Sequence, residues 1–312
     1  MRTSKPIHAM WLAGALFCAP AVCFAQAAPQ RVVSSDAPQR VVSSDAPQRV
    51  VSSDAPQRVV SMNLCTDQLA MLIAGEGQLL SVSQLASDPR SSAMVVQADQ
   101  YITNHGRAEE IYLMQPDLVL TSPYSARATV RMLERLGIRV ETFEISNSLS
   151  TIPDQLTHMG EILGQQDKAA ALVAEYQTAL AAFQATPSNR PTAAVYQANG
   201  YTTGDRSMAG EILTLAGFEN AAVAAGYAGG GIIPLEVLAM AQPDAVIQSL
   251  PYEGGSRAEE IMDHPAVAAL RKNGERAGLT DHDWVCGTPF VLRAIAKMTE
   301  LRIRIQAQGA VE

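Results

Sequence analysis

Two stretches, EEIYLMQPDLVL at residues 109–120 and EVLAMAQPDAVI at residues 236–247, follow one pattern. In each, a Glu opens a short apolar run, Pro-Asp follows, and a continuous aliphatic segment comes next. Because Pro ends a helix and restricts the residue before it, each stretch predicts a helix, a turn and a strand. An uninterrupted apolar strand is typical of a parallel sheet buried on both faces. Since the copies lie 127 positions apart, we expect two lobes of one design.

The leading residues, Glu109 and Glu236, are not explained by this pattern. Each stands seven positions before its Pro. A carboxylate in the first turn of a helix is stabilised by the helix dipole, by about 0.3–1 kcal/mol. Two exposed acids at matched positions would also suit a partner with paired basic patches, where charge guides register and encounter rate. The spacing alone favours the helix-dipole interpretation.

Strands and helices alternate on either side of these stretches. We expect strands at 59–62, 79–82, 117–121, 140–145, 193–197 and 245–249. Helices are expected between them, the first over 66–74 with Thr66 as its N-cap and the last over 289–307. Such alternation predicts an α/β fold with parallel strands and helical crossovers.

The middle of the chain differs, because residues 151–163 and 167–185 both carry a helical pattern with only three residues between them. A polar, Pro-containing break follows at 186–191. The second helix is either a stiff connector between two α/β halves or an ordinary packing helix, and periodicity does not separate these alternatives.

Length and charge restrict the class of protein. The chain has 312 residues, enough for two domains with proper cores, and 47% of them are apolar. Its formal net charge is −8, which argues against a nucleic-acid partner and against docking on anionic lipid.

The N-terminus reads as an export signal followed by a repeat. Residues 1–27 combine Arg2 and Lys5, a short apolar segment and an Ala-Gln-Ala cleavage site at 25–27. The nine-residue unit APQRVVSSD then occurs three times over 28–54, and a fourth copy runs into the first strand. We expect 1–27 to be a signal peptide and 28–54 a disordered leader.

Four cysteines divide into two pairs. Cys18 and Cys23 lie in the signal region, and the residues before them do not favour lipidation. Cys65 and Cys286 remain after cleavage, and an even count in an exported protein favours a disulfide between them. The alternative is two separate buried thiols.

The motifs of several enzyme classes are absent from the sequence. The five histidines show no metal-binding spacing, no GxSxG elbow occurs, and the Gly cluster at 225–232 lacks the Lys-Ser/Thr of a phosphate loop. An enzymatic interpretation therefore rests on little.

Large polar and aromatic residues instead follow the predicted strands, where parallel α/β sheets collect their ligands. Aromatic residues are only 5% of the chain, so their placement on these loops is informative. Aromatic and Arg side chains suit a flat or metal-chelate ligand, although any single loop Tyr equally well covers the edge of a lobe. The candidate ligand-binding residues are Asn63, Tyr124, Arg127, Tyr201, Tyr252, Asp283 and Trp284.

From residue 58 onward the chain resembles the iron-siderophore and vitamin B12 (cobalamin) class of periplasmic solute-binding proteins, which serve ABC importers. The likeness is carried by the two Pro-Asp stretches and by RVVSMNLCTDQLAMLIAG at 58–75, LAGFENAA at 215–222 and DWVCGTPF at 283–290. It implies a class III fold, in which two parallel-sheet α/β lobes are joined by a single long rigid helix. The lobes would be 55–165 and 190–312, with the connecting helix at 166–189.

The resemblance also assigns roles. One Glu on each lobe of this family contacts arginines of the membrane permease, and Glu109 and Glu236 match those positions. The resemblance therefore favours permease docking over helix-dipole stabilisation as the role of these two residues. The segment 283–290 looks like the cleft lining of cobalamin-binding members but has Gly287-Thr288 where they carry an Arg. Tyr124 and Arg127 would serve as the Tyr and Arg that hold a hydroxamate siderophore.

We therefore expect a monomeric periplasmic receptor, not an enzyme, that binds a small-molecule metal chelate and delivers it to an ABC permease dimer. An Fe(III)-siderophore is favoured over cobalamin, with haem third, and no cofactor is needed because the metal arrives within the chelate. A Cys65–Cys286 disulfide would tie the lobes together. The competing class is an exported α/β enzyme that uses the same cleft. A zinc or manganese receptor would need a His/carboxylate cluster that the sequence does not show.

Overall fold

The computed structural model describes residues 55–144, 146–183, 187, 189–249, 254–270, 277–278 and 281–309. The predicted signal peptide (1–27), the repeat leader (28–54) and Tyr252 lie outside the described residues. Within those residues, no helix combines the length and the apolar character needed to cross a bilayer.

The first lobe is built on a five-stranded parallel sheet with the order β3-β2-β1-β4-β5. Its strands are β1 (Val59–Ser61), β2 (Leu79–Ser83), β3 (Ile102–Asn104), β4 (Leu118–Thr121) and β5 (Val140–Thr142). The strand order reverses between β1 and β4, and this is the position where open α/β sheets bind their ligands.

The second lobe repeats the plan with a four-stranded parallel sheet in the order β11-β10-β6-β8. The strands are β6 (Thr192–Val195), β8 (Glu219–Asn220), β10 (Ala245–Gln248) and β11 (Ala277–Gly278). A small antiparallel pair, β7 (Tyr201–Thr202) and β9 (Gly231–Ile232), adds to this lobe. The predicted α/β fold with parallel sheets is confirmed.

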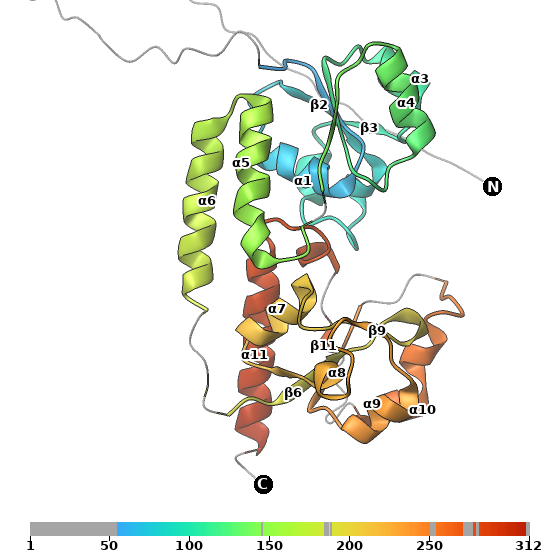
Figure 1. Ribbon diagram of the computed structural model, residues 1–312, viewed down its shortest axis with the longest axis vertical. Helices are drawn as coiled ribbons and strands as arrows, with labels where there is room; N and C mark the ends of the chain where they lie inside the picture. The colour runs from blue at the N-terminus through green and yellow to red at the C-terminus, as the bar shows by residue number, and fades with distance from the viewer. Residues whose placement is uncertain are drawn as a thin grey trace, which may run out of the picture. The chain divides into compact units, whose positions relative to one another are not determined.

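Helices connect the strands in both lobes (Figure 1). In the first lobe they are α1 (Leu64–Ile73), α2 (Val95–Ala98), α3 (Ala108–Leu113), α4 (Arg127–Arg135), α5 (Ile152–Leu163) and α6 (Gln166–Ala181). In the second they are α7 (Met208–Leu215), α8 (Ala221–Ala224), α9 (Leu235–Ala241), α10 (Pro265–Leu270) and α11 (Val291–Gly309). Short 3₁₀ turns are η1 (Gln84–Ser87), η2 (Leu149–Thr151), η3 (Ala198–Gly200), η4 (Glu260–Asp263) and η5 (Asp281–Asp283).

The predicted N-cap of α1 is wrong. Asn63, not Thr66, caps the helix, because the Asn63 side chain accepts a hydrogen bond from the Cys65 amide at 3.0 Å. Thr66 lies inside the helix, where its hydroxyl donates to the Asn63 carbonyl oxygen at 2.9 Å. Either residue type can cap a helix, so the local sequence does not decide between them.

The Asp of each Pro-Asp motif accepts hydrogen bonds from backbone amides at the start of the neighbouring strand, in both lobes. Asp117 accepts hydrogen bonds from the Gln57 and Arg58 amides at 2.7 and 3.0 Å, immediately before β1. Asp244 likewise accepts from the Thr192 amide at 2.8 Å, at the start of β6. Each Asp therefore ties the entrance of its own strand to the neighbouring central strand, which fixes their register.

The two middle helices form an antiparallel hairpin in which α6 lies alongside α5 (Figure 1). Gly160 allows this close approach, since a Cβ there would lie 2.4 Å from the Ala169 Cβ. The expected connecting helix over 166–189 is too long, because α6 ends at Ala181. A single rigid connector is not confirmed. Within the described residues, the 19-residue α11 is longer than the 16-residue α6.

One hydrophobic core runs through both lobes. It contains alternate residues of the central strands, including Val59 and Leu118 in the first lobe and Ala193 and Ile247 in the second, together with residues of α5, α6, α7 and α11. Two smaller clusters, one around Ile111 and the other around Leu238, cover the opposite faces of the two sheets. Because the lobes share buried apolar surface, opening them far apart would expose it to water, which restricts their relative motion.

Candidate functional site

The predicted disulfide between Cys65 and Cys286 is present. It joins the first turn of α1 to the segment between η5 and α11, across a sequence separation of 221 residues. His282 adds a second link, since its Nδ1 lies 3.0 Å from the Pro89 carbonyl oxygen. The segment 282–288 is therefore held against the first lobe.

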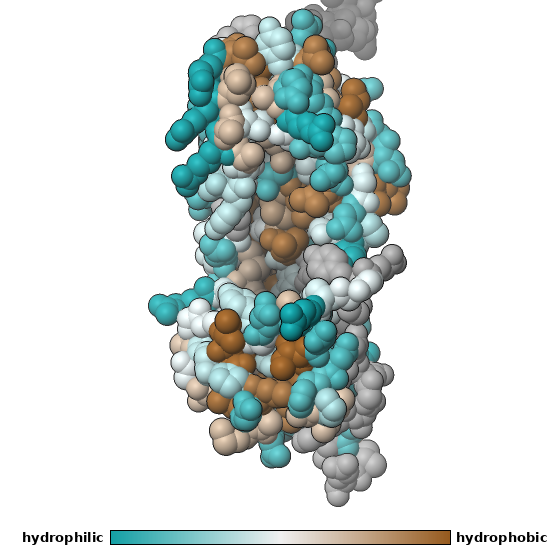
Figure 2. Space-filling view, turned by 90° about the vertical axis from the view of Figure 1, so that its right-hand side faces the viewer, coloured by the Kyte–Doolittle hydropathy of each residue, from teal (hydrophilic) through white to brown (hydrophobic). Residues whose placement is uncertain are grey.

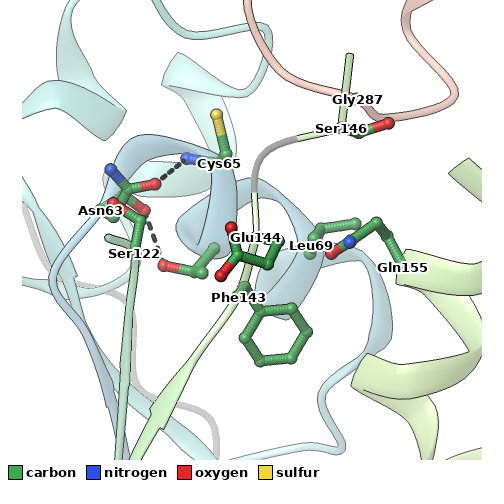
Figure 3. Close-up of a pocket in the computed structure, with 10 residues that line it drawn as sticks. Asn63, Cys65, Leu69, Ser122, Phe143, Glu144, Ser146, Gln155 and Gly287 are labelled. Carbon is green, nitrogen blue, oxygen red and sulfur yellow. Dashed lines mark hydrogen bonds between the residues drawn. The ribbon is translucent and has the colours of Figure 1, made fainter. Parts of the chain in front are cut away.

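A small pocket lies beside the disulfide, at the carboxyl edge of the first sheet (Figure 3). Asn63 follows β1 and Ser122 follows β4, so the pocket occupies the point where the strand order reverses. The remaining lining residues are Cys65, Thr66, Leu69, Phe143, Glu144, Ser146, Gln155 and Gly287. Its interior of about 10 Å³ has room for about one water molecule, so a chelate would have to bind outside it.

Gly287 is required by this packing. A Cβ at this position would lie 2.1 Å from the Ser146 Cβ, and Figure 3 shows the two residues side by side. A residue larger than Gly at position 287 would therefore require Ser146 or its backbone to shift.

The candidate ligand residues lie in different environments. Tyr124 and Arg127, after β4, are both exposed, and Tyr124 is 79% exposed. Tyr201 is 49% exposed and pairs with Ile232 across β7 and β9. Asn63 is half-buried, and its amide oxygen caps α1. Tyr124, Arg127 and Tyr201 are thus the candidates with the most accessible side chains.

Asp283 is held by ion pairs, and Trp284 is packed against the hydrophobic core. The Asp283 carboxylate is 1% exposed and pairs with Arg293 Nε at 2.9 Å and Lys297 Nζ at 2.6 Å, both on α11. Trp284 is half-buried and packs against the core common to the two lobes. These contacts anchor the segment that carries Cys286.

Glu211 also joins the lobes, and no local sequence pattern predicts this role. From α7, its carboxylate accepts hydrogen bonds from the Leu149 amide at 2.7 Å and the Ser148 hydroxyl at 3.0 Å, at the start of η2. A cavity of about 510 Å³ lies here, lined by Ser148, Leu149, Ser150, Leu180, Asp205, Glu211, Thr214 and Leu215. An acid that caps a turn 62 residues away leaves no local pattern.

Asp67 is a buried acid on α1. Burial raises its pKa to about 7, although hydrogen bonds involving Ser61 and Ser83 act in the opposite direction. The Ser83 amide donates to Asp67 Oδ1 at 3.1 Å and the Ser83 hydroxyl to Oδ2 at 2.5 Å. This acid therefore connects α1 to the end of β2.

Glu109 and Glu236 occupy equivalent places. Each lies in the first turn of its helix, α3 or α9, and each side chain is exposed. The predicted helix openings are confirmed. Among the described residues, no group of three or more His, Cys, Asp or Glu side chains is arranged to hold a metal ion.

The face of the molecule in Figure 2 is hollowed between the two lobes, and hydrophobic side chains border the hollow. Together with twin parallel sheets and one common core, this defines a bilobal binding protein. Residues 59–275 match a family model described as periplasmic binding protein, and the chain belongs to that family.

Solved structures share the fold. A periplasmic heme-binding protein from Pseudomonas aeruginosa aligns with a TM-score of 0.63 and 23% identity, over 79% of this chain and 92% of that one. An ABC-type Fe3+-hydroxamate transport protein from Saccharomonospora viridis aligns at 0.59 and 21%, over 79% and 93%. The vitamin B12-binding protein BtuF of Vibrio cholerae aligns at 0.56 and 19%, over 80% and 98%. A comparison with curated proteins finds no match.

Proposed function

We propose that this protein is the periplasmic receptor of an ABC importer, which captures a metal chelate between its lobes and delivers it to the permease. The observation that carries the proposal is the pair of exposed acids, Glu109 and Glu236, at equivalent positions on two lobes that share one core. A receptor that docks with both lobes on a permease dimer needs such a pair at a nearly fixed separation.

The proposed ligand class is supported by the accessible side chains near the carboxyl ends of the strands. Tyr124 and Tyr201 offer aromatic faces for stacking and Arg127 offers a guanidinium that donates charge-assisted hydrogen bonds, which suits a metal chelate with flat groups and acceptor oxygens. An Fe(III)-siderophore is our first choice and cobalamin the second. In either case the metal arrives inside the ligand, so the protein needs no metal-ligand cluster of its own.

Heme is a further candidate, favoured by one observation. Tyr124 is 79% exposed, and a Tyr oxygen is a known axial ligand of heme iron. A Tyr124→Phe variant separates the alternatives. If heme is the ligand, loss of the hydroxyl changes the visible spectrum of the bound heme, whereas stacking of a siderophore on the ring persists.

The test of ligand capture is a thermal-shift panel of the mature protein with a ferric hydroxamate siderophore, cyanocobalamin and heme. A ligand at 100 times its Kd should stabilise the folded state by about 2.7 kcal/mol. Stoichiometric binding without chemical change of the ligand supports a receptor. Turnover of the ligand would favour the exported enzyme instead.

Docking is tested by the Glu109→Ala/Glu236→Ala double variant. We expect ligand affinity to remain and transport to fall, because both acids lie on exposed helix starts. Unchanged transport would reject the docking role, and lost ligand affinity would place the acids in the ligand site.

A further inference from the structure

Helices α3 and α9, which carry Glu109 and Glu236, each also carry an exposed apolar side chain. Leu113 on α3 is 80% exposed and Met240 on α9 is 77% exposed, and both rank among the most exposed large hydrophobic residues of the described chain. They stand 127 positions apart, the same offset as Glu109 and Glu236. A single exposed Leu or Met is ordinary, but the same exposure at the same place in both lobes needs an explanation.

The helices show how this exposure arises. Both are short, and each buries one equivalent large side chain, Ile111 in α3 and Leu238 in α9. Positions 109 and 113, like 236 and 240, are four apart and therefore neighbours on one helix face. Since all four side chains are exposed, each lobe presents an acid and an apolar group together on the side away from its core.

Glu110, the acid next to Glu109, differs from it because its side chain is held by contacts with His105. Glu110 accepts a hydrogen bond from the His105 amide at 2.8 Å, and its Oε1 lies 3.0 Å from His105 Nδ1. The second lobe has Val237 at that position. The features common to both lobes are thus one outward Glu and one outward apolar residue four positions later.

We propose that Leu113 and Met240 are apolar anchors that insert into the permease beside the bases that meet Glu109 and Glu236. This inference rests on the proposed function and adds a partner of stated chemistry, a dimer that presents a basic group next to an apolar hollow twice. Charge guides the encounter, while burial of the two side chains slows dissociation.

The test measures binding of the full mature chain to the ABC permease of the same import system, reconstituted in nanodiscs. Leu113→Ala and Met240→Ala should each weaken binding about tenfold, the loss expected when one large apolar side chain no longer becomes buried. The double variant should lose about a hundredfold, since well-separated sites act additively. Ligand affinity should not change.

Matched variants isolate the apolar effect. Ile303→Ala, at a 54% exposed position on α11, should leave permease binding intact, and the exchange Leu113→Met with Met240→Leu should retain it. The loss of permease affinity in Leu113→Ala and Met240→Ala should persist at high salt. The loss in Glu109→Ala and Glu236→Ala should become smaller, because salt already screens the charge contacts of the wild type.

Three results would overturn the proposal. If the wild type binds the permease and the double alanine variant binds equally well, the anchors are wrong and the proposed function stands. If the wild type sediments as a dimer that the alanine changes dissociate, the partner is a second copy. If the wild type does not bind the permease at all, the anchors and the docking function fail together.

Discussion

Replacing both Cys65 and Cys286 by Ser should lower the free energy of unfolding by about 2–5 kcal/mol. The disulfide spans 221 residues, and the chain-entropy model gives about 5 kcal/mol for a loop of that length, towards the upper end of measured effects. Guanidinium unfolding followed by fluorescence measures the change. Loss of the cross-link should also raise the m-value, because the unfolded chain becomes more expanded.

The matched control is the wild-type chain unfolded in the presence of reductant, which should follow the curve of the double Ser variant. Intact mass after alkylation checks that the exported wild type carries no free thiol. A difference of less than about 1 kcal/mol between wild type and variant would refute the argument from the unfolded state. Two alkylated cysteines in exported protein would refute the bond itself.

Two other substitutions test the packing around the disulfide. Gly287→Ala should cost about 1–3 kcal/mol, because the new methyl group meets Ser146 Cβ at 2.1 Å, and Gly287→Ala with Ser146→Gly should recover part of the loss in thermal unfolding. Asp67 has a folded pKa of about 7 against an ordinary value of 3.8, so the stability tied to its protonated form is complete below about pH 4 and is lost as pH rises through 7. Between about pH 4 and pH 7, the free energy of unfolding of the wild type should therefore fall by up to about 4 kcal/mol relative to that of Asp67→Asn. Equal pH dependence of the free energy of unfolding in the two proteins would contradict this.

The parts of the fold that could be predicted are those with a local cause. Pro-Asp after an apolar helical run marks a turn into a buried strand, and the carboxylates of Asp117 and Asp244 hold the same position in both sheets. The disulfide could be predicted from compartment and count alone. The position of Glu109 and Glu236 at helix starts follows from their distance to Pro.

The rest depended on contacts between distant residues. No Gly or Pro marks the end of α6 at Ala181, so the sequence pattern predicts a helix that extends past this residue to 185. Arg293 and Lys297 reach Asp283 from the next helix, and the sequence carries no local sign of these two ion pairs. The exposure of Leu113 and Met240 also has no sequence signal, because an apolar residue in an amphipathic run predicts burial.

The central claim is capture of a metal chelate by a receptor of this family. Its most direct test is a titration of the mature protein, monitored by intrinsic fluorescence, with a ferric hydroxamate siderophore, cyanocobalamin and heme. We predict saturable, stoichiometric binding of one of the three, with the ligand recovered chemically unchanged. Absence of binding to all three, or chemical conversion of the bound compound, would contradict the account.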